Sequence, residues 1–325
     1  PPGASRIMIR ELRTQARPKD IAVVGAGPIG LEAALYGAAL GHRPVVYERL
    51  EAGANIRRWE FLELFSPWAL NTSELGRATL REMGLSIPDR TIADLRQDGP
   101  FGVRAECPAA GEYCDSYIEP LAAALGKSVR TGCEVLGIAR AGLLKTEAIG
   151  TAERSAARFK LLLETGKGIR KTESADVVID ATGVYRNPAS LGAGGIPAPG
   201  EEELSDLISY HIPDVRGAHR RLYAGSTTLL VGAGYSAATV LAAFAMLLEE
   251  EPGTGLIWAR RDSRKEPLPV IENDPLPQRA RLSQVANRLS TSPPAGCEVL
   301  EGLVISSLRQ EDGKIHVELC GPQEQ

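Results

Sequence analysis

Two stretches of the chain, residues 20–48 and 227–261, carry the same order of apolar and polar positions. Each begins with a short apolar run rich in β-branched residues, passes through a glycine-rich turn, and continues in a helix-compatible run rich in Ala and Leu. A second short apolar run follows and ends in charged residues. Short apolar runs bounded by turn residues are typical of buried strands. The pattern therefore predicts a strand, a tight turn, a helix and a second strand in each stretch.

The remaining chain alternates between short apolar runs and polar, glycine-containing segments. The further predicted elements are a helix over 117–125, a short parallel strand at 128–130, an antiparallel meander over 133–176, a buried strand over 175–183, and a second alternating region over 304–319 with Gly313 in its turn. Together these elements predict an α/β fold with two Rossmann-like three-layer nucleotide-binding domains, each with an antiparallel β-meander.

Composition and charge narrow the classes of function. The chain has 325 residues, 43% hydrophobic and 24% charged, which is typical of soluble globular proteins. The formal net charge is -4, so the chain lacks the excess of positive charge that is typical of nucleic-acid-binding proteins. No apolar run in the sequence is long enough to cross a membrane. The five cysteines are odd in number and widely spaced, which favours a reducing, cytoplasmic location over a disulfide scaffold.

The first glycine-rich turn, Gly25-Ala26-Gly27-Pro28-Ile29-Gly30, has the residues that a dinucleotide pyrophosphate needs. In such a turn the first glycine permits the tight bend, the second admits the phosphates, and the third permits close packing of helix and strand. The helix N-terminus offers unpaired N–H groups to the phosphates. Glu48, followed by Arg49, ends the second strand where a carboxylate would accept hydrogen bonds from ribose hydroxyls. A carboxylate repels a 2′-phosphate, so this site suits FAD or NAD.

The second turn, Gly232-Ala233-Gly234-Tyr235-Ser236-Ala237, keeps two of the glycines and has Ala237 in place of the third, which is a tolerated change. Ser236 stands where it could cap the helix or donate to a pyrophosphate. Arg260 and Arg261 stand at the end of the second strand of this unit. Arginine binds phosphate in a bidentate manner, so the second site suits NADP, the alternative being that the pair lies in a solvated turn.

Two dinucleotide sites of different charge in one chain imply hydride transfer from NADPH to a flavin, with Thr182 and Gly183 at a strand end beside the flavin. Aromatic residues are scarce, yet Trp59, Phe61, Phe65 and Trp68 fall close together in the sequence. This cluster either walls a flat heteroaromatic ring or forms a patch of the core.

These motifs resemble the two-dinucleotide-binding-domain flavoproteins, and within them the flavin-containing monooxygenase branch. The second part of this resemblance rests on Leu70-Asn71-Thr72-Ser73-Glu74-Leu75, which is similar to the Asn-containing motif of that branch. The resemblance implies that Asn71 lies beside the flavin and helps to stabilise its oxygenated form, a C4a-(hydro)peroxyflavin. It also implies a small-molecule substrate and oxygen as partners.

The resulting domain assignment is a flexible N-terminal arm over 1–19, an FAD-binding domain over 20–225 and an NADP-binding domain over 226–325. The second copy of the repeat ends soon after Leu319 without the strand that closes the first copy. We therefore expect the chain to be incomplete at its C-terminus, lacking the segment that returns to the FAD domain. The oligomeric state is open, a homodimer being one arrangement.

Two other functions stay open from the sequence. One is an NADPH-dependent reductase or dehydrogenase that does not oxygenate a substrate, and the other is a non-catalytic nucleotide-sensing flavoprotein module. A disulfide-reductase chemistry has little support, since Cys107 and Cys114 lack redox-pair spacing. The scattered histidines form no metal-ligand pattern.

Overall fold

The computed structural model describes residues 17–87, 107–166 and 168–321, and the chain forms two compact units, Pro1–Val184 and Tyr185–Gln325. The predicted N-terminal arm lies outside the described residues except for 17–19. The division at Val184 precedes the domain boundary proposed from the sequence, because residues 198 and 204 pack with the strands of the second unit.

The first unit is built on a parallel sheet with the strand order β3-β2-β1-β7. Its strands are β1 (Asp20–Val24), β2 (Arg43–Tyr47), β3 (Val129–Arg130) and β7 (Val177–Asp180). Helix α2 (Pro28–Ala39) connects β1 to β2, and Val23 pairs with Val46 on one side and Ile179 on the other. The predicted strand–turn–helix–strand unit and the short third strand are confirmed.

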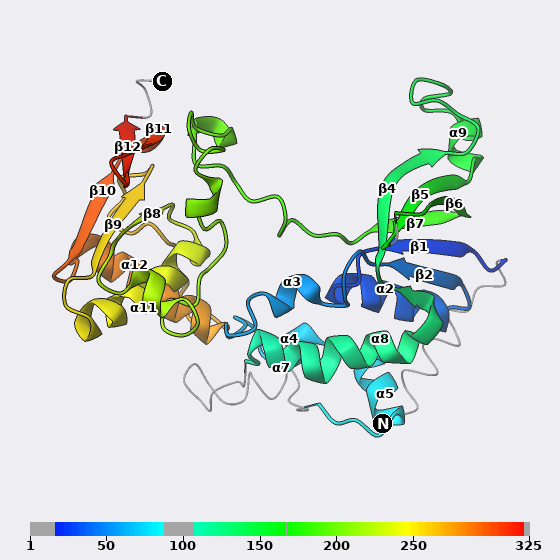
Figure 1. Ribbon diagram of the computed structural model, residues 1–325. Helices are drawn as coiled ribbons and strands as arrows, with labels where there is room; N and C mark the ends of the chain where they lie inside the picture. The colour runs from blue at the N-terminus through cyan, green and yellow to red at the C-terminus, as the bar shows by residue number, and fades with distance from the viewer. Residues whose placement is uncertain (1–16, 88–106, 167, 322–325) are drawn as a thin grey trace. The chain divides into compact units, whose positions relative to one another are not determined.

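The two faces of this sheet are covered by different layers, which Figure 1 shows below and above the strands. Ile21, Val23 and Val46 pack on one side with the helical layer. Ala22 and Tyr47 pack on the other with Leu161 and Leu163 of the antiparallel meander. The meander strands are β4 (Cys133–Arg140), β5 (Phe159–Thr165) and β6 (Arg170–Ala175), and α9 (Ala152–Ala156) lies between β4 and β5. The other helical segments are α3 (Ala54–Arg57), α4 (Trp68–Asn71), α5 (Glu74–Glu82), α7 (Ala110–Tyr113), η1 (Cys114–Ile118), α8 (Glu119–Leu125) and η2 (Gly126–Ser128).

The second unit repeats this plan with fewer strands. Its parallel sheet has the order β10-β9-β8, and helix α11 connects β8 to β9. A two-stranded antiparallel hairpin, β11-β12, takes the place of the meander. The bounds are β8 (Thr227–Val231), α11 (Tyr235–Glu250), β9 (Gly255–Arg260), α12 (Pro277–Thr291), β10 (Cys297–Glu301), β11 (Val304–Glu311) and β12 (Lys314–Cys320). Helix α12 and strand β10 were not predicted from the sequence.

The segment before β8 is organised around a buried carboxylate. It contains η3 (Ala193–Gly195), η4 (Ser205–Leu207) and α10 (Arg220–Tyr223). Glu201, 2% exposed, accepts hydrogen bonds from the backbone N–H groups of Leu191 and Ala198 and from the Tyr210 hydroxyl. One carboxylate thereby gathers three separate parts of the segment.

The charge of Glu201 makes the stability of this segment depend on pH. Burial by itself raises the pKa of Glu201, but the hydrogen bonds from Ala198, Leu191 and Tyr210 outweigh it, so the pKa lies below its ordinary value of 4.5. A carboxyl whose pKa is lower in the folded state stabilises the fold above its unfolded pKa, and the contribution is lost as pH falls through the folded pKa.

We therefore expect Glu201→Gln to unfold at lower denaturant concentration than the wild type at pH 7, with the difference shrinking steadily below pH 4.5. Denaturant titrations at a series of pH values, with the exposed Glu202→Gln as control, measure this. If the difference in stability between Glu201→Gln and the wild type does not change between pH 7 and the acid range, the charge of the Glu201 carboxylate contributes nothing to stability.

Candidate functional site

The first glycine turn lies at the carboxyl end of β1, where β1, α2 and the end of β7 meet without room for side chains. Gly25 has a φ of 103°, and a Cβ there would come within 2.6 Å of the Ala181 carbonyl oxygen. A Cβ on Gly30 would overlap the carbonyl oxygen of Gly25 itself. Both glycines are therefore required by backbone geometry and packing.

The middle of the same turn is open. A Cβ on Gly27 would have no heavy atom within 4 Å, and Gly27 has extended dihedral angles, φ −79° and ψ −176°. Pro28 occupies the first helical position, so the N–H groups that remain unpaired at this helix end start with Ile29 and Gly30. The Ile29 side chain is 71% exposed. An open backbone beside an exposed apolar side chain suits a ligand with a pyrophosphate and a flat ring.

Glu48 lies against this turn. Its carboxylate accepts hydrogen bonds from the N–H groups of Ala26, at 2.8 Å, and Leu50, at 2.9 Å. The carbonyl of Ala26 in turn accepts from the N–H of Gly53, at 3.0 Å. The acid at the end of β2 and the turn at the end of β1 are thus brought together, as the spacing in the sequence predicts for a ribose-binding carboxylate.

The end of β7 completes this edge of the sheet. The Asp180 carboxylate accepts hydrogen bonds from the hydroxyl and the N–H of Thr182, which lower its pKa below the ordinary value. Gly183 follows with a φ of 66°, and both Thr182 and Gly183 are exposed. Asp180 was not a candidate in the sequence, although its place at a strand end next to the glycine turn is a signal that could have found it.

Asn71 is held by its own turn. Its amide donates to the carbonyls of Ser66 and Pro67, at 2.6 and 3.1 Å, and its side-chain oxygen accepts from the Ser66 hydroxyl. The Tyr113 hydroxyl donates to the Asn71 carbonyl. A direct role of the Asn71 amide at a flavin therefore requires that it exchange these bonds.

The aromatic cluster divides between core and surface. Trp68 is buried and lies 5.9 Å from Tyr113 between ring centres, so this member belongs to the core. Trp59 is half-buried shortly after α3, and Phe61 is exposed. Arg49 pairs with Glu134 at 3.5 Å, which directs it toward the meander.

A shallow cavity of about 500 Å³ lies next to the ends of β2 and β3. It is lined by Glu51, Ala52, Glu119, Ala122, Ala123, Gly126, Val129 and Thr131. The carboxyl ends of parallel strands are where nucleotides bind in open α/β sheets, and the cavity follows Glu48 along this edge.

The second glycine turn reproduces the backbone of the first. Gly232 has a φ of 112°, and Gly234 has φ −82° and ψ −179° with no heavy atom within 4 Å of an added Cβ. The N–H of Gly232 donates to the carbonyl of Ala259, as that of Gly25 donates to Tyr47. Ala237, in place of the third glycine, is buried without disturbing this geometry.

The side chains of the second turn differ in their contacts. The Tyr235 hydroxyl lies 3.2 Å from the Ser283 hydroxyl, which joins the turn to α12. Ser236 is exposed in the first turn of α11.

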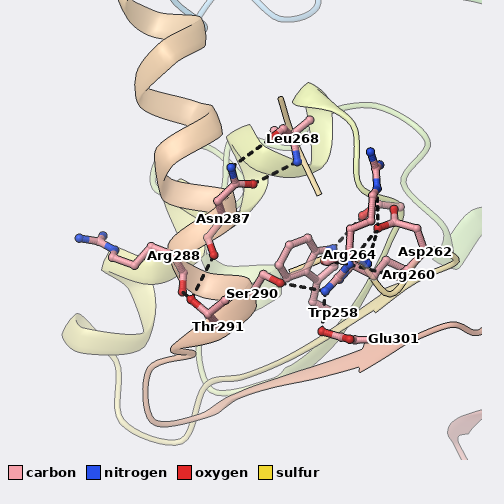
Figure 2. A network of polar contacts seen from close by, with 11 residues as sticks. Trp258, Arg260, Asp262, Arg264, Leu268, Asn287, Arg288, Ser290, Thr291 and Glu301 are labelled. Carbon is pink, nitrogen blue, oxygen red and sulfur yellow. Dashed lines mark hydrogen bonds and ion pairs between the residues drawn. The ribbon is translucent and has the colours of Figure 1, made fainter. Parts of the chain in front are cut away.

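Arg260 is placed differently from the expectation. Its side chain is 0% exposed, and it donates to the carbonyls of Asp262 and Arg264, the Ser290 hydroxyl and the carboxylates of Asp262 and Glu301 (Figure 2). The expected surface cation is therefore a buried one with several partners, because helix α12 and strand β10 enclose the end of β9. Ser290 and Glu301 lie 30 and 41 residues away in the sequence, so no local signal could have found them.

Arg261 keeps the expected position. It is exposed at the end of β9, at the same edge of its sheet as the glycine turn that follows β8. Of the two arginines predicted to face a 2′-phosphate, Arg261 alone has a free path to solvent.

Within the described ranges no group of three or more metal-binding side chains comes together. Cys107 and Cys114 are free, and burial raises the pKa of Cys107 to about 11 and that of Cys114 above its ordinary value. Thiols of this kind are poor nucleophiles at neutral pH. None of the helices described is both long and apolar enough to span a bilayer.

The chain matches no protein-family model and no curated protein sequence. Among solved structures it is similar to the FAD-bound cadaverine monooxygenase of desferrioxamine biosynthesis from Erwinia amylovora, with a TM-score of 0.63 and 13% identity over 95% of this chain and 74% of that one. It is also similar to the bacillithiol disulfide reductase from Bacillus cereus, with a TM-score of 0.56 and 16% identity over 93% and 75% of the two chains.

A third similar structure is the ornithine N-hydroxylase from Kutzneria sp. 744 with reduced FAD, NADP+ and L-ornithine, with a TM-score of 0.56 and 13% identity over 95% and 77% of the two chains. At these identities the likeness shows the fold. The predicted fold class, a mixed α/β structure with Rossmann-type units, is therefore confirmed.

The contrast between the tight and open glycines of the first turn is testable by adding one methyl group at each. We expect Gly30→Ala to destabilise the first unit by about 1–3 kcal/mol, because its Cβ overlaps backbone. Gly27→Ala should leave stability unchanged, because its Cβ meets nothing. Denaturant unfolding of the two variants measures both; equal stabilities would contradict the described packing of the turn.

Proposed function

We propose that the protein is an FAD-dependent oxidoreductase reduced by NADPH. The observation that carries this proposal is the presence of two glycine turns with matching backbone geometry but opposite charge at the end of the following strand. Glu48 ends β2 beside the first turn, and Arg261 follows β9 in the second unit. One unit is thus suited to a free ribose and the other to a phosphorylated one.

The first unit would hold FAD. The open backbone at Gly27 and the N–H groups of Ile29 and Gly30 suit its pyrophosphate. Glu48 would exchange its hydrogen bonds to the Ala26 and Leu50 N–H groups for bonds from the ribose hydroxyls. The cavity beyond Glu48, with Ala52 and Val129 in its lining, suits the adenine. Thr182 and Gly183 lie exposed at the β7 end, within the same edge of the sheet.

The second unit would hold NADPH. The turn at Gly232 and Gly234 and the exposed hydroxyl of Ser236 suit the pyrophosphate, and Arg261 suits the 2′-phosphate. Tyr235 contributes by joining the helix start to α12, through Ser283. Arg260 is not a phosphate ligand in this proposal, because its donors are directed into the protein.

We further propose that the protein is a monooxygenase of small molecules. A bound flavin supplies hydride acceptance from NADPH and the activation of oxygen. The fold is shared by the similar cadaverine monooxygenase and ornithine N-hydroxylase, whose substrates are amines. In this chain the segment 66–73 carries Asn71 in a turn supported by Tyr113, and we assign to it the positioning of the wall around the flavin.

The competing enzyme function is a reductase, since the same fold occurs in the bacillithiol disulfide reductase. The thiols of Cys107 and Cys114, both of raised pKa, disfavour a dithiol chemistry in this chain. A nucleotide-sensing module without catalysis is the remaining alternative, and it predicts binding without turnover.

The first experiment is a visible absorption spectrum of the purified protein reconstituted with FAD. We expect flavin bands that bleach on anaerobic addition of NADPH, followed on admission of air by a persistent oxygen-dependent band. Immediate return of the oxidised spectrum would favour a reductase. Failure to take up FAD, with NADP(H) binding retained, would leave only the nucleotide-binding module.

The role of the segment 66–73 is tested with Asn71→Ala. Loss of three local hydrogen bonds should loosen the turn and shorten the lifetime of the oxygen-dependent band, while flavin reduction by NADPH stays unchanged. Stopped-flow absorption measures both steps, with the exposed Asn187→Ala as control. An unchanged lifetime would remove Asn71 from the oxygenation machinery.

A further inference from the structure

The turn that follows β9, residues 261–268, is held at its start by the buried guanidinium of Arg260. This side chain donates to the carbonyl oxygens of Asp262, at 3.0 Å, and Arg264, at 2.6 Å. The same guanidinium is anchored from behind by the Ser290 hydroxyl of α12 and the Glu301 carboxylate at the end of β10 (Figure 2). Two backbone carbonyls of the turn are thus tied to one rigid group.

The far end of the 261–268 turn is held by Asn287. This buried amide of α12 accepts a hydrogen bond from the Leu268 N–H, at 3.0 Å, and donates one to the Leu268 carbonyl, at 2.9 Å. Asn287 lies on the same helix as Ser290, so α12 holds both ends of the turn (Figure 2). The Arg264 guanidinium adds a bond across the turn to the Pro267 carbonyl.

Cations are displayed on the outside of this fixed turn. Arg261 and Lys265 are exposed, and the Arg264 side chain is 67% exposed. Two acids stand in the same turn: Asp262, which is shared between Arg260 and Arg264, and the exposed Glu266. The positive charge of Arg260 itself is balanced by Asp262 and by Glu301, whose side chain is 39% exposed.

A buried arginine with a carboxylate partner is a poor way to gain stability alone, since desolvating both charges offsets most of their attraction. Its distinctive property is that a planar guanidinium can bind several acceptors in a fixed geometry. In Arg260 those acceptors include the backbone of the turn that carries the exposed cations. Its hydrogen bonds therefore determine where these cations stand.

We propose that Arg260 is a positioning residue for 2′-phosphate recognition, holding the 261–268 turn so that Arg261 meets the phosphate, with Asn287 as the second anchor. This inference rests on the proposed function, in which the second unit binds NADPH. It assigns to Arg260 a role in nucleotide selectivity without any contact to the nucleotide. Arg261 is the direct ligand.

The test is the ratio of the Kd for NAD+ to the Kd for NADP+, measured by calorimetry on the full chain. This ratio isolates the contribution of the 2′-phosphate, because the two nucleotides differ only in that group. We expect Arg260→Met and Arg261→Ala each to lower this ratio by about tenfold or more, the value of one charge-assisted hydrogen bond, with the Kd for NAD+ unchanged. Asn287→Ala should lower it in the same direction by less. Arg309→Ala, an exposed arginine of β11, is the control and should leave both Kd values unchanged.

A double substitution separates positioning from direct contact. If Arg260 acts through Arg261, adding Arg260→Met to Arg261→Ala should cost little further selectivity, whereas two independent ligands would give additive losses. Additive losses, an unchanged ratio in Arg260→Met, or an equal weakening of NAD+ and NADP+ would each overturn the proposal. If Arg260→Met does not fold, Asn287→Ala tests the proposal instead. An unchanged ratio of the two Kd values in Asn287→Ala would also contradict the proposal.

The outcome for the wild type separates this inference from the proposed function. A wild-type protein that binds neither nucleotide, or that binds both equally, contradicts the NADPH function itself, and the positioning role is overturned with it. A clear preference for NADP+ that survives Arg260→Met and Asn287→Ala contradicts the positioning role alone.

Discussion

The first unit depends on a steric constraint where β1, α2 and β7 meet. Gly25 bends the chain with a positive φ against the backbone of Ala181, and Gly30 passes so close to Gly25 that no side chain fits between them. This contact sets the start of α2 directly over the end of β1. It also leaves Gly27, between the two crowded glycines, as an open backbone at the helix N-terminus. The crowding on either side thus leaves an open backbone between them, which is the feature that suits a pyrophosphate in the proposed FAD site.

The second unit reaches the same backbone geometry with less crowding. Gly232 and Gly234 match Gly25 and Gly27 in their dihedral angles, but a Cβ at Gly232 would meet no neighbouring atom within 4 Å. Ala237 is accommodated as a buried residue at the position where the first unit has Gly30. The two turns therefore share their backbone angles and their open middle glycine, and they differ in how closely the surrounding backbone packs against them.

The ends of the following strands carry the chemical difference between the units. Glu48 is placed by the first glycine turn and by its own neighbour in the chain, since it accepts hydrogen bonds from the N–H groups of Ala26 and Leu50. The cations after β9 depend on groups brought in from α12 and β10, namely Asn287, Ser290 and Glu301. The second unit thus has a buried arginine at the end of its second strand, where the first unit has a single carboxylate after its second strand.

The sequence by itself determined the repeated strand–turn–helix–strand units, the meander and the place of Glu48 at the first turn. These features follow from local periodicity, from the glycine positions and from the spacing between the first turn and Glu48. The sequence could not determine the burial of Arg260, the commitment of the Asn71 amide to its own turn, or the inclusion of Trp68 in the core. The burial of Arg260 depends on partners distant in the chain, and that of Trp68 on which face of its helix is covered. The Asn71 amide has nearby partners, Ser66 and Pro67, but the conformation of their turn is not evident from the residue pattern. A charged residue at a strand end is exposed or buried according to the elements that pack over that end, and only the tertiary structure decides this.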